Sequence, residues 1–212
     1  MKERRLAFCK IMLEKDDSFW ERVIFSDESR ISLWKSDEPP MVRRRKSESL
    51  KGKYLLPTVK YPLNIMIWGC FRKNKIGPLA NIDGTMDNKK YIQVLETKVL
   101  PFIGEEKPNY IFRDDSAPCH RSATVKKYNE GNEIQSLDWP GNSPDLNPIE
   151  NLCSIPKRKI AMKAPFSKRT LIEALIDIWN NDIDNDLLST LIASMRNRIS
   201  QFIKNRGDHT IY

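Results

Sequence analysis

Carboxyl-bearing residues follow three runs of β-branched and aromatic residues that have the pattern of buried strands. Asp27 lies at the end of "RVIFSDE", Asp114 and Asp115 end "NYIFRDD", and Glu150 follows the last run, in "SPDLNPIENL". Acidic groups at the carboxyl ends of neighbouring strands can meet at one edge of a sheet. Such a cluster of hard, anionic oxygens suits Mg²⁺ or Mn²⁺. Two of these ions, about 3.5–4 Å apart, can serve both the attacking and the leaving oxygen of a phosphodiester displacement.

Glu150 also has a purely structural interpretation. Asn147 is a favoured N-cap residue, Pro148 suits the first helical position, and Glu150 then occupies the third. In that arrangement, a capping box, the glutamate side chain reaches back to the backbone amide of the N-cap residue. Taken by itself, the stretch leaves two roles open for Glu150, a helix cap or a metal ligand.

The cysteine and histidine content excludes several other kinds of site. The four cysteines are far apart and form no CxxC pair, so neither a zinc site nor a disulfide framework is indicated, and buried free thiols are expected. His120 and His209 are the only histidines, which excludes an imidazole-rich metal site. Any metal ion must therefore be held by carboxylates.

The chain carries a formal net charge of +8, with 36 basic and 28 acidic residues. A surplus of this size favours a polyanionic partner, most simply nucleic acid. Eight basic and three acidic residues lie between Lys35 and Lys60, and the run Arg43, Arg44, Arg45, Lys46 is at the centre of this stretch. The run is expected to contact phosphates; the alternative is a solvated loop or a nuclear localisation signal.

The distribution of apolar residues indicates a soluble, intracellular protein with one core. Hydrophobic residues make up 40% of the chain, which suffices for one sizeable domain. No apolar run approaches the ~20 residues that cross a bilayer, and the first residues lack a signal-peptide pattern, so no membrane partner is expected. We expect residues 1–212 to form a single domain, with a basic loop insertion at about 35–62 and C-terminal helices at about 165–205.

Hydrophobic periodicity predicts an α/β order of elements. An amphipathic helix over residues 3–20 comes first, and "RISLW" is expected to pair with the strand "RVIFSDE". Helices and strands alternate later in the chain, which predicts that the later strands are parallel. The other expected strands are "LNIMIWGCF", "IGPLANI", "NYIFRDD" and "IQSLDW"; the other expected helices are "DNKKYIQVLETKVLPF", "HRSATVKKYNE", the helix opened by Asn147, and residues 170–179 and 187–203.

Several segments resemble the signature segments of the mariner-type superfamily of DNA transposases. They are "FSDES" (25–29), "IWGCF" (67–71), "IDGTMDNKKYIQVLE" (82–96), "DDSAPCHRS" (114–122) and "DWPGNSPDLNPIENL" (138–152). They occur in the family's order and at fitting distances, and the resemblance covers nearly the whole chain from Arg5 to about Lys163. The resemblance implies a ribonuclease-H-like fold, a mixed sheet with flanking helices, which agrees with the order of elements above.

The resemblance also implies which residues form the site. The family's Asp, Asp, Glu triad falls on Asp27, Asp115 and Glu150, as catalytic residues and metal ligands. Asp115 is preferred to Asp114 because 34 residues separate it from Glu150 and because it begins the family pattern D-x-x-P-x-H. Asp114 is then a nearby helper or a strand-end acid. His120 can orient a phosphate or a group near Asp115, or lie at the surface as the start of a helix. Lys157, Arg158 and Lys159 can contact DNA phosphates or form a solvated helical face.

The function implied by the resemblance is cut-and-paste DNA transposition. Metal-activated water would hydrolyse a phosphodiester at an element's end, and the freed 3′-hydroxyl would attack target DNA at a TA dinucleotide. Two Mg²⁺ ions are implied, for which Mn²⁺ can substitute. The implied partners are double-stranded DNA and a second copy of the chain as a homodimer, in the nucleus, with no small-molecule substrate.

The chain departs from the family pattern in two places. Relatives begin with a bipartite helix-turn-helix region that recognises transposon ends, and there is no room for it before Asp27. After Glu150 the family continues with Trp and a helix-compatible stretch, whereas this chain has Cys153 and Pro156; a proline inside a helix costs ~3 kcal/mol or kinks it. These departures predict a truncated or decayed copy of a mobile element. The alternatives are an inactive DNA- or protein-binding remnant and, disfavoured by the motifs, a ribonuclease-H-like nuclease acting on RNA–DNA hybrids.

Overall fold

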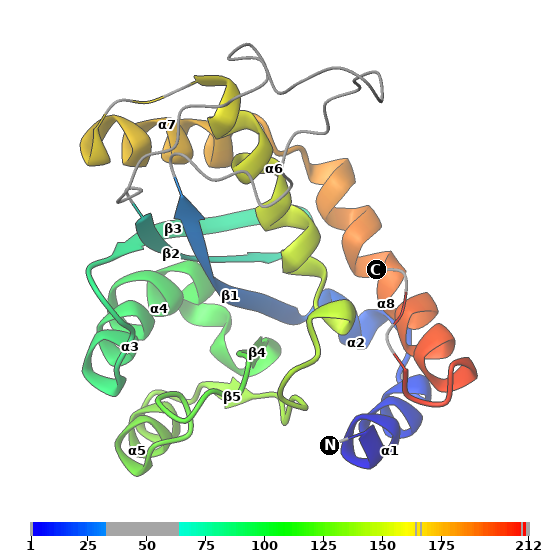
Figure 1. The fold of residues 1–212 in the computed structure, drawn as a ribbon. Helices are drawn as coiled ribbons and strands as arrows, with labels where there is room; N and C mark the ends of the chain where they lie inside the picture. The colour runs from blue at the N-terminus through cyan, green and yellow to red at the C-terminus, as the bar shows by residue number, and fades with distance from the viewer. Residues whose placement is uncertain (1, 33–63, 164, 166, 209, 211–212) are drawn as a thin grey trace, which may run out of the picture.

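A five-stranded mixed sheet forms the centre of the fold. The computed structural model describes residues 2–32, 64–163, 165, 167–208 and 210. The strands are β1 (Val23–Ser32), β2 (Asn64–Arg72), β3 (Lys75–Ile82), β4 (Ile111–Arg113) and β5 (Gln135–Ser136). They lie in the order β3-β2-β1-β4-β5, with β1, β4 and β5 parallel and the β1-β2 and β2-β3 pairs antiparallel (Figure 1). The α/β class and the parallel later strands are therefore confirmed.

Helices cover both faces of this sheet (Figure 1). They are α1 (Lys2–Leu13), α2 (Asp17–Glu21), α3 (Asn88–Val94), α4 (Leu100–Ile103), α5 (Ala123–Gly131), α6 (Pro148–Lys163), α7 (Lys168–Asn181) and α8 (Asn185–Lys204). Alternate residues of β1 point to opposite faces. Phe25 packs with side chains of α1, α2, α6 and α8, whereas Ile24 packs with α3, α4 and α5. Both residues are fully buried, so β1 is the central strand of a three-layer arrangement.

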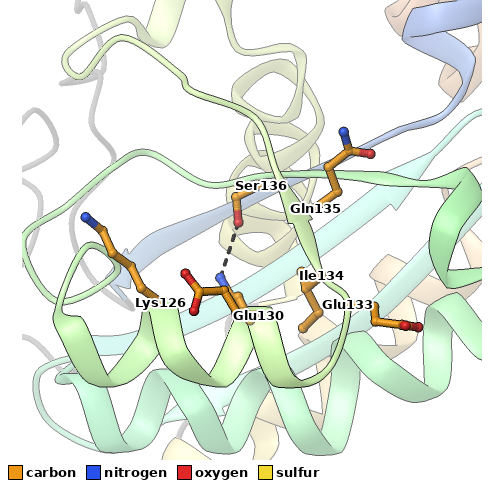
Figure 2. Close-up of a pocket in the computed structure, with 7 residues that line it drawn as sticks. Lys126, Glu130, Glu133, Ile134, Gln135 and Ser136 are labelled. Atoms are coloured by element: carbon orange, nitrogen blue, oxygen red, sulfur yellow. Dashed lines mark hydrogen bonds between the residues drawn. The ribbon is translucent and has the colours of Figure 1, made fainter.

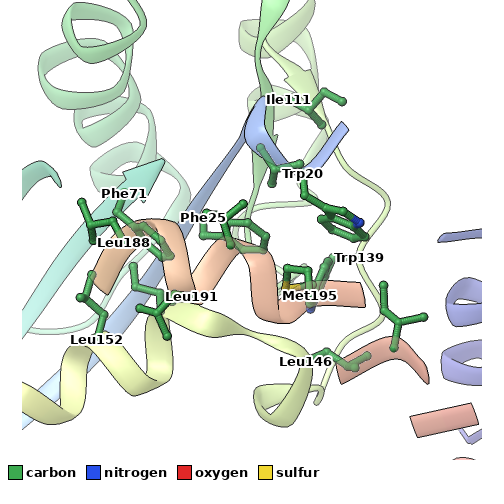
Figure 3. Packing of buried hydrophobic residues seen from close by; sticks show 14 of the residues in the cluster. Trp20, Phe25, Phe71, Ile111, Trp139, Leu146, Leu152, Leu188, Leu191 and Met195 are labelled. Carbon is green, nitrogen blue, oxygen red and sulfur yellow. The ribbon is translucent and has the colours of Figure 1, made fainter. Parts of the chain in front are cut away.

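The larger core lies between the sheet and helices α1, α6 and α8. Figure 3 shows Trp20, Phe25 and Trp139 in it, and the rings of Phe25 and Trp139 meet edge to face at 6.2 Å. Trp139 is fully buried, so this segment between β5 and α6 is anchored by a large apolar side chain. Among the described residues, no helix combines the length and the apolarity that crossing a membrane requires.

The prediction of one helix over residues 3–20 is wrong. The chain forms two helices, because Asp16 begins a new one: its Oδ1 accepts a hydrogen bond from the Phe19 backbone N–H at 3.0 Å. An aspartate at an N-cap favours a helix start over continuation of the preceding helix. The apolar periodicity runs across the junction and therefore hid the break.

The separate strand expected at "RISLW" does not form. Residues 23–32 make one continuous strand, and its ladder with β2 runs from Phe25 opposite Phe71 to Ser32 opposite Asn64. No glycine or proline interrupts this segment, so nothing turns the chain between the two expected strands. Asp27 therefore lies within β1 rather than at its end. It is nevertheless just beyond the parallel pairing with β4, which stops at Phe25.

Candidate active site

The alternation of β1 sends two neighbouring acids to opposite faces of the sheet. Asp27 is in phase with Phe25 and faces α6, while Glu28 is in phase with Ile24 and faces the α3 and α5 side. Asp27 Oδ1 accepts a hydrogen bond from the Glu28 backbone N–H at 2.9 Å. Its Oδ2 accepts one from the side-chain amide of Asn147 at 2.7 Å, so α6 is tied to the centre of the sheet at this acid.

The two acids after β4 have different surroundings. Asp114 is buried, and its carboxylate accepts hydrogen bonds from the Ser116 backbone N–H at 2.8 Å and from the Tyr91 hydroxyl at 3.1 Å. The side chain of Asp115 is 41% exposed, and its Oδ1 accepts from the Ala117 backbone N–H at 2.8 Å. Ser116 has a φ of 62°, which turns the chain sharply after β4 and separates the two carboxylates. Asp115 is thus the acid with an open side.

His120 lies inside the protein, not at the surface. Its ring stacks on Tyr91 with centroids 3.9 Å apart, its Nδ1 is 2.8 Å from Asp115 Oδ1, and its Nε2 is 3.4 Å from Glu28 Oε1. One ligand atom from each of Glu28, Asp115 and His120 falls within 4.8 Å of the others. Burial alone would lower the pKa of His120, but the two carboxylates outweigh it and raise that pKa to about 10. Burial raises the pKa of Asp115, and His120 and the Ala117 N–H reverse this, leaving it below its ordinary value.

Glu150 lies exposed in the first turn of α6. Its charge reaches Asp27: burial raises the pKa of Asp27 to about 7, the Arg113 guanidinium opposes this, and Glu150, Glu28 and Asp115 reinforce it. Three carboxylates from β1, the β4 turn and α6 therefore share one electrostatic environment. The sequence predicted that Asp27, Asp115 and Glu150 meet at one edge; the charges of Asp115 and Glu150 both act on Asp27, whereas the described side chains whose ligand atoms come within 4.8 Å of one another are Glu28, Asp115 and His120.

The predicted capping box is wrong. The Asn147 backbone N–H donates to the Pro144 carbonyl at 3.0 Å and is not available to Glu150. Asn147 Oδ1 is buried and has no hydrogen-bond partner in the described part of the chain, where α6 lies, so the side chain does not cap α6. The competing interaction is the bond from its amide to Asp27. Sequence rules for caps consider only local partners and cannot anticipate a partner 120 residues away.

Arg113 and Glu28 are two residues of this region that the sequence interpretation missed. Arg113 is buried beneath the acids; its Nη1 donates to the Ser26 carbonyl at 2.7 Å, and its guanidinium lies 4.6 Å from the centre of the Trp139 ring. Its charge lowers the pKa of Asp27 and of Asp115. A signal for Glu28 was present, because an acid next to Asp27 on a buried strand must face the opposite side.

The predicted DNA-binding residues lie further along α6 than Glu150 or outside the described residues. Lys159 forms an ion pair with Asp182, with 3.0 Å between Nζ and Oδ2, while Arg158 is exposed and Lys157 half-buried. This pairing favours the solvated helical face for Lys159. The run Arg43 to Lys46 falls outside the described residues, and so does the expected loop insertion around it.

Two hollows lie beside the parallel part of the sheet. One, between α5 and β5, is shown in Figure 2; Lys126, Glu130 and Ser136 line it, and none of the three clustered acids does. The other has a volume of about 360 Å³ and is lined by Asp115 and by Arg4 of α1. Of the three acids, only Asp115 lines this second hollow.

Comparisons with known proteins identify the family. Residues 22–172 match a family described as "DDE superfamily endonuclease". The chain is 33% identical to the Tc1 transposase of Caenorhabditis elegans over 210 residues, covering 98% of this chain and 77% of that protein. It is 31% identical to the Tcb2 transposase of Caenorhabditis briggsae over 213 residues, covering 98% and 77%.

Solved structures with the same fold come from the Mos1 transposase. A Mos1 paired-end complex with the left transposon end superposes with a TM-score of 0.83 at 19% identity, covering 98% of this chain and 62% of that one. The isolated Mos1 catalytic domain gives a TM-score of 0.72 at 18% identity, covering 99% and 95%. The chain thus spans less than two thirds of the Mos1 chain in the complex. From the matched family and the Tc1 and Tcb2 identities, the chain belongs to the DDE endonuclease superfamily of Tc1/mariner transposases, and it has the ribonuclease-H-like fold of their catalytic domain.

Proposed function

We propose that this chain is the catalytic domain of a cut-and-paste DNA transposase, with Asp27, Asp115 and Glu150 as its catalytic residues. The observation that carries the proposal is that the three acids lie in β1, in the turn after β4 and in the first turn of α6, all within residues 22–172 that match the endonuclease family. They come from three separate elements, and the matched family acts as endonucleases. A chance cluster would not be expected to combine this placement with that family.

The residues fit a pair of divalent cations. The donors are carboxylates, and a cation can reach Asp115 and Glu150, which are partly or fully exposed. Without cations, burial and the neighbouring acids make the charge on Asp27 unfavourable. Asp27, Asp115 and Glu150 would hold Mg²⁺, or Mn²⁺ in its place, and one Mos1 paired-end structure is a complex with Mg while another is a complex with Mn. When bound, two such ions would lower the pKa of a water and stabilise the leaving oxygen.

The chain's own residues prepare the site for this chemistry. The Ala117 N–H and His120 fix Asp115, and the Asn147 amide fixes Asp27. In the first step the oxygen of a water molecule forms a bond to phosphorus, and the bond from phosphorus to the 3′ oxygen breaks. That oxygen leaves as a 3′-hydroxyl, which then attacks a phosphorus of target DNA and displaces a 3′ oxygen there. Because the carboxylates are held in place, the attacking oxygen would approach phosphorus in line with the oxygen that leaves.

Double-stranded DNA is the proposed substrate, and a homodimer in the nucleus is the proposed working form. The net charge of +8 and the run Arg43 to Lys46 support DNA binding, with Lys157 and Arg158 as further candidates. Mos1 forms a complex in which transposon ends are paired, which supports a dimer here. Light scattering in the presence of DNA tests this, and a monomeric mass would exclude the dimer.

Nicking of supercoiled plasmid by the purified chain tests the proposed function. We expect nicking in Mn²⁺ and Mg²⁺, none in EDTA, and a loss of at least about 100-fold in Glu150→Gln, because the side chain keeps its size but loses its charge. Glu130→Gln is the matched control, since this exposed glutamate lines the hollow of Figure 2 and should nick normally. A folded protein that binds DNA but nicks under none of these conditions would instead be an inactive DNA-binding remnant.

A further inference from the structure

Asn147 connects two parts of the candidate active site that are far apart in the sequence. It immediately precedes α6, is 1% exposed, and donates a hydrogen bond of 2.7 Å from its side-chain amide to Asp27 Oδ2. Glu150 follows three residues later, in the first turn of the same helix. A single side chain therefore joins the strand that carries the first acid to the helix that carries the third.

The start of α6 differs from the start of the other capped helices. In five helices the side chain of the residue before the helix accepts a hydrogen bond from the backbone N–H three residues on; these residues are Asp16, Asp87, Ser122, Ser167 and Asp184. Asn147 has the same opportunity, because asparagine is among the best N-cap residues. Its buried Oδ1 nevertheless has no hydrogen-bond partner among the residues that the structure describes. The side chain forgoes a stabilising cap while it contacts Asp27.

Asp27 has few other groups to hold it. Its Oδ1 accepts the hydrogen bond from the Glu28 backbone N–H, and its Oδ2 accepts the one from Asn147. A carboxylate has about four acceptor positions, so these two bonds leave room for a cation on each oxygen. Without the amide, Oδ2 would lose the one hydrogen bond that fixes it among the described residues.

We propose that Asn147 is a positioning residue that fixes the Asp27 carboxylate, and its distance from Glu150, in the orientation that binds divalent cations. The proposal rests on the function proposed above. A partner that orients a metal ligand commonly changes metal affinity or activity by 10–100-fold when removed. The same asparagine acting only as a helix cap would change stability and leave metal affinity alone.

Two substitutions separate these roles. Asn147→Ser and Asn147→Thr both place a good N-cap residue before α6 but cannot deliver an amide to Asp27. We expect Mn²⁺ binding, measured by calorimetry without DNA, to weaken about 10–100-fold, while the melting temperature is unchanged or rises. Asp184→Ser is the matched control, since it makes the same kind of change at the cap of α8 and should keep wild-type Mn²⁺ affinity.

A double-mutant cycle tests whether Asn147 acts through Asp27. In an Asp27→Asn background, Asn147→Ser should have little further effect on Mn²⁺ affinity. Wild-type Mn²⁺ affinity in a folded Asn147→Ser or Asn147→Thr protein would overturn the proposal and leave the proposed function standing. A wild-type chain that neither binds Mn²⁺ nor nicks DNA would overturn the proposed function and the positioning role with it.

Discussion

Asp27 carries its charge in unfavourable surroundings until a cation binds. Burial, with Glu150, Glu28 and Asp115 nearby, raises its pKa from an ordinary 3.8 to about 7. Between these two values the folded state holds a proton that the unfolded state has lost, so this residue's contribution to stability falls as the pH rises. A bound cation replaces the proton. Metal binding should therefore release a proton and become tighter as the pH rises through the pKa of Asp27.

The increase in melting temperature caused by Mn²⁺ measures this linkage. We expect this increase to be larger at about pH 8 than at about pH 6, because a smaller fraction of Asp27 is protonated at the higher pH and must lose its proton to bind the ion. Asp27→Asn should remove most of the pH dependence. Equal Mn²⁺ effects at both pH values in the wild-type chain would contradict the raised pKa of Asp27.

At the scale of single residues, the sequence was sufficient to find the acids and insufficient to find their partners. Asp27, Asp115 and Glu150 stand out because strand patterns and family motifs are local signals. In the sequence, nothing distinguishes Arg113 from an exposed basic residue at the end of a strand. Its guanidinium is covered by Trp139, which is distant in the chain. Asn147 looked like a helix cap for the same reason. Partner choice is a tertiary property, which local rules do not contain.

Pro156 is an interruption that α6 tolerates. The helix runs from Pro148 to Lys163 through this residue, although a proline has no N–H to donate to the carbonyl of Leu152. Pro156 is buried, so packing offsets part of this loss. The expected cost of a proline in a helix interior is ~3 kcal/mol.

Replacing this proline should stabilise the protein. We expect Pro156→Ala to raise the free energy of unfolding by about 1–3 kcal/mol, since it restores a backbone hydrogen bond and loses some packing. Pro148→Ala is the matched control: at the first helical position a proline is favourable, so the change should be below about 1 kcal/mol. A Pro156→Ala protein that melts no higher than wild type would count against the strain in α6.

Elements were predicted well where their own residues decide the structure. β2, β3 and the helices α7 and α8 appear where hydrophobic periodicity placed them, because each buries several apolar residues. Helix α5 also appears, although Val125 is its single buried residue. Besides the divided first helix and the missing strand at "RISLW", errors occur at boundaries. β4 and β5 pair over only three and two residues, since the neighbouring strand rather than the apolar run sets the length of a ladder.

On the scale of the whole molecule, both ends of the described chain support the segment that leads to Glu150. Arg5 of α1 forms a buried ion pair with Asp145, and Arg198 of α8 donates to the Asp145 carbonyl at 3.0 Å and to Asn151 Oδ1 at 2.6 Å. The Thr210 backbone N–H also donates to Asp145, at 3.2 Å. The candidate site thus depends on helices that carry none of its acids, and no sequence pattern connected them to it.

The basic run Arg43, Arg44, Arg45, Lys46 should contribute to DNA binding through phosphate contacts. The logarithm of the DNA association constant falls with the logarithm of salt concentration, by about 0.9 for each phosphate neutralised. Changing all four residues to Gln should therefore reduce this slope by about 3–4 and weaken binding to all sequences alike. Filter binding to a plasmid fragment at several salt concentrations measures the slope.

A second variant with the same charge separates local contacts from net charge. Lys2, Lys163, Lys168 and Arg169 already pair with surface carboxylates at 2.8, 2.6, 2.6 and 2.8 Å. Changing these four residues to Gln lowers the net charge by the same amount. Because their charges are already partly neutralised, we expect a clearly smaller loss of slope. Equal losses of slope in the two variants would mean that DNA binding depends only on the total charge of +8 and that the run makes no phosphate contacts of its own.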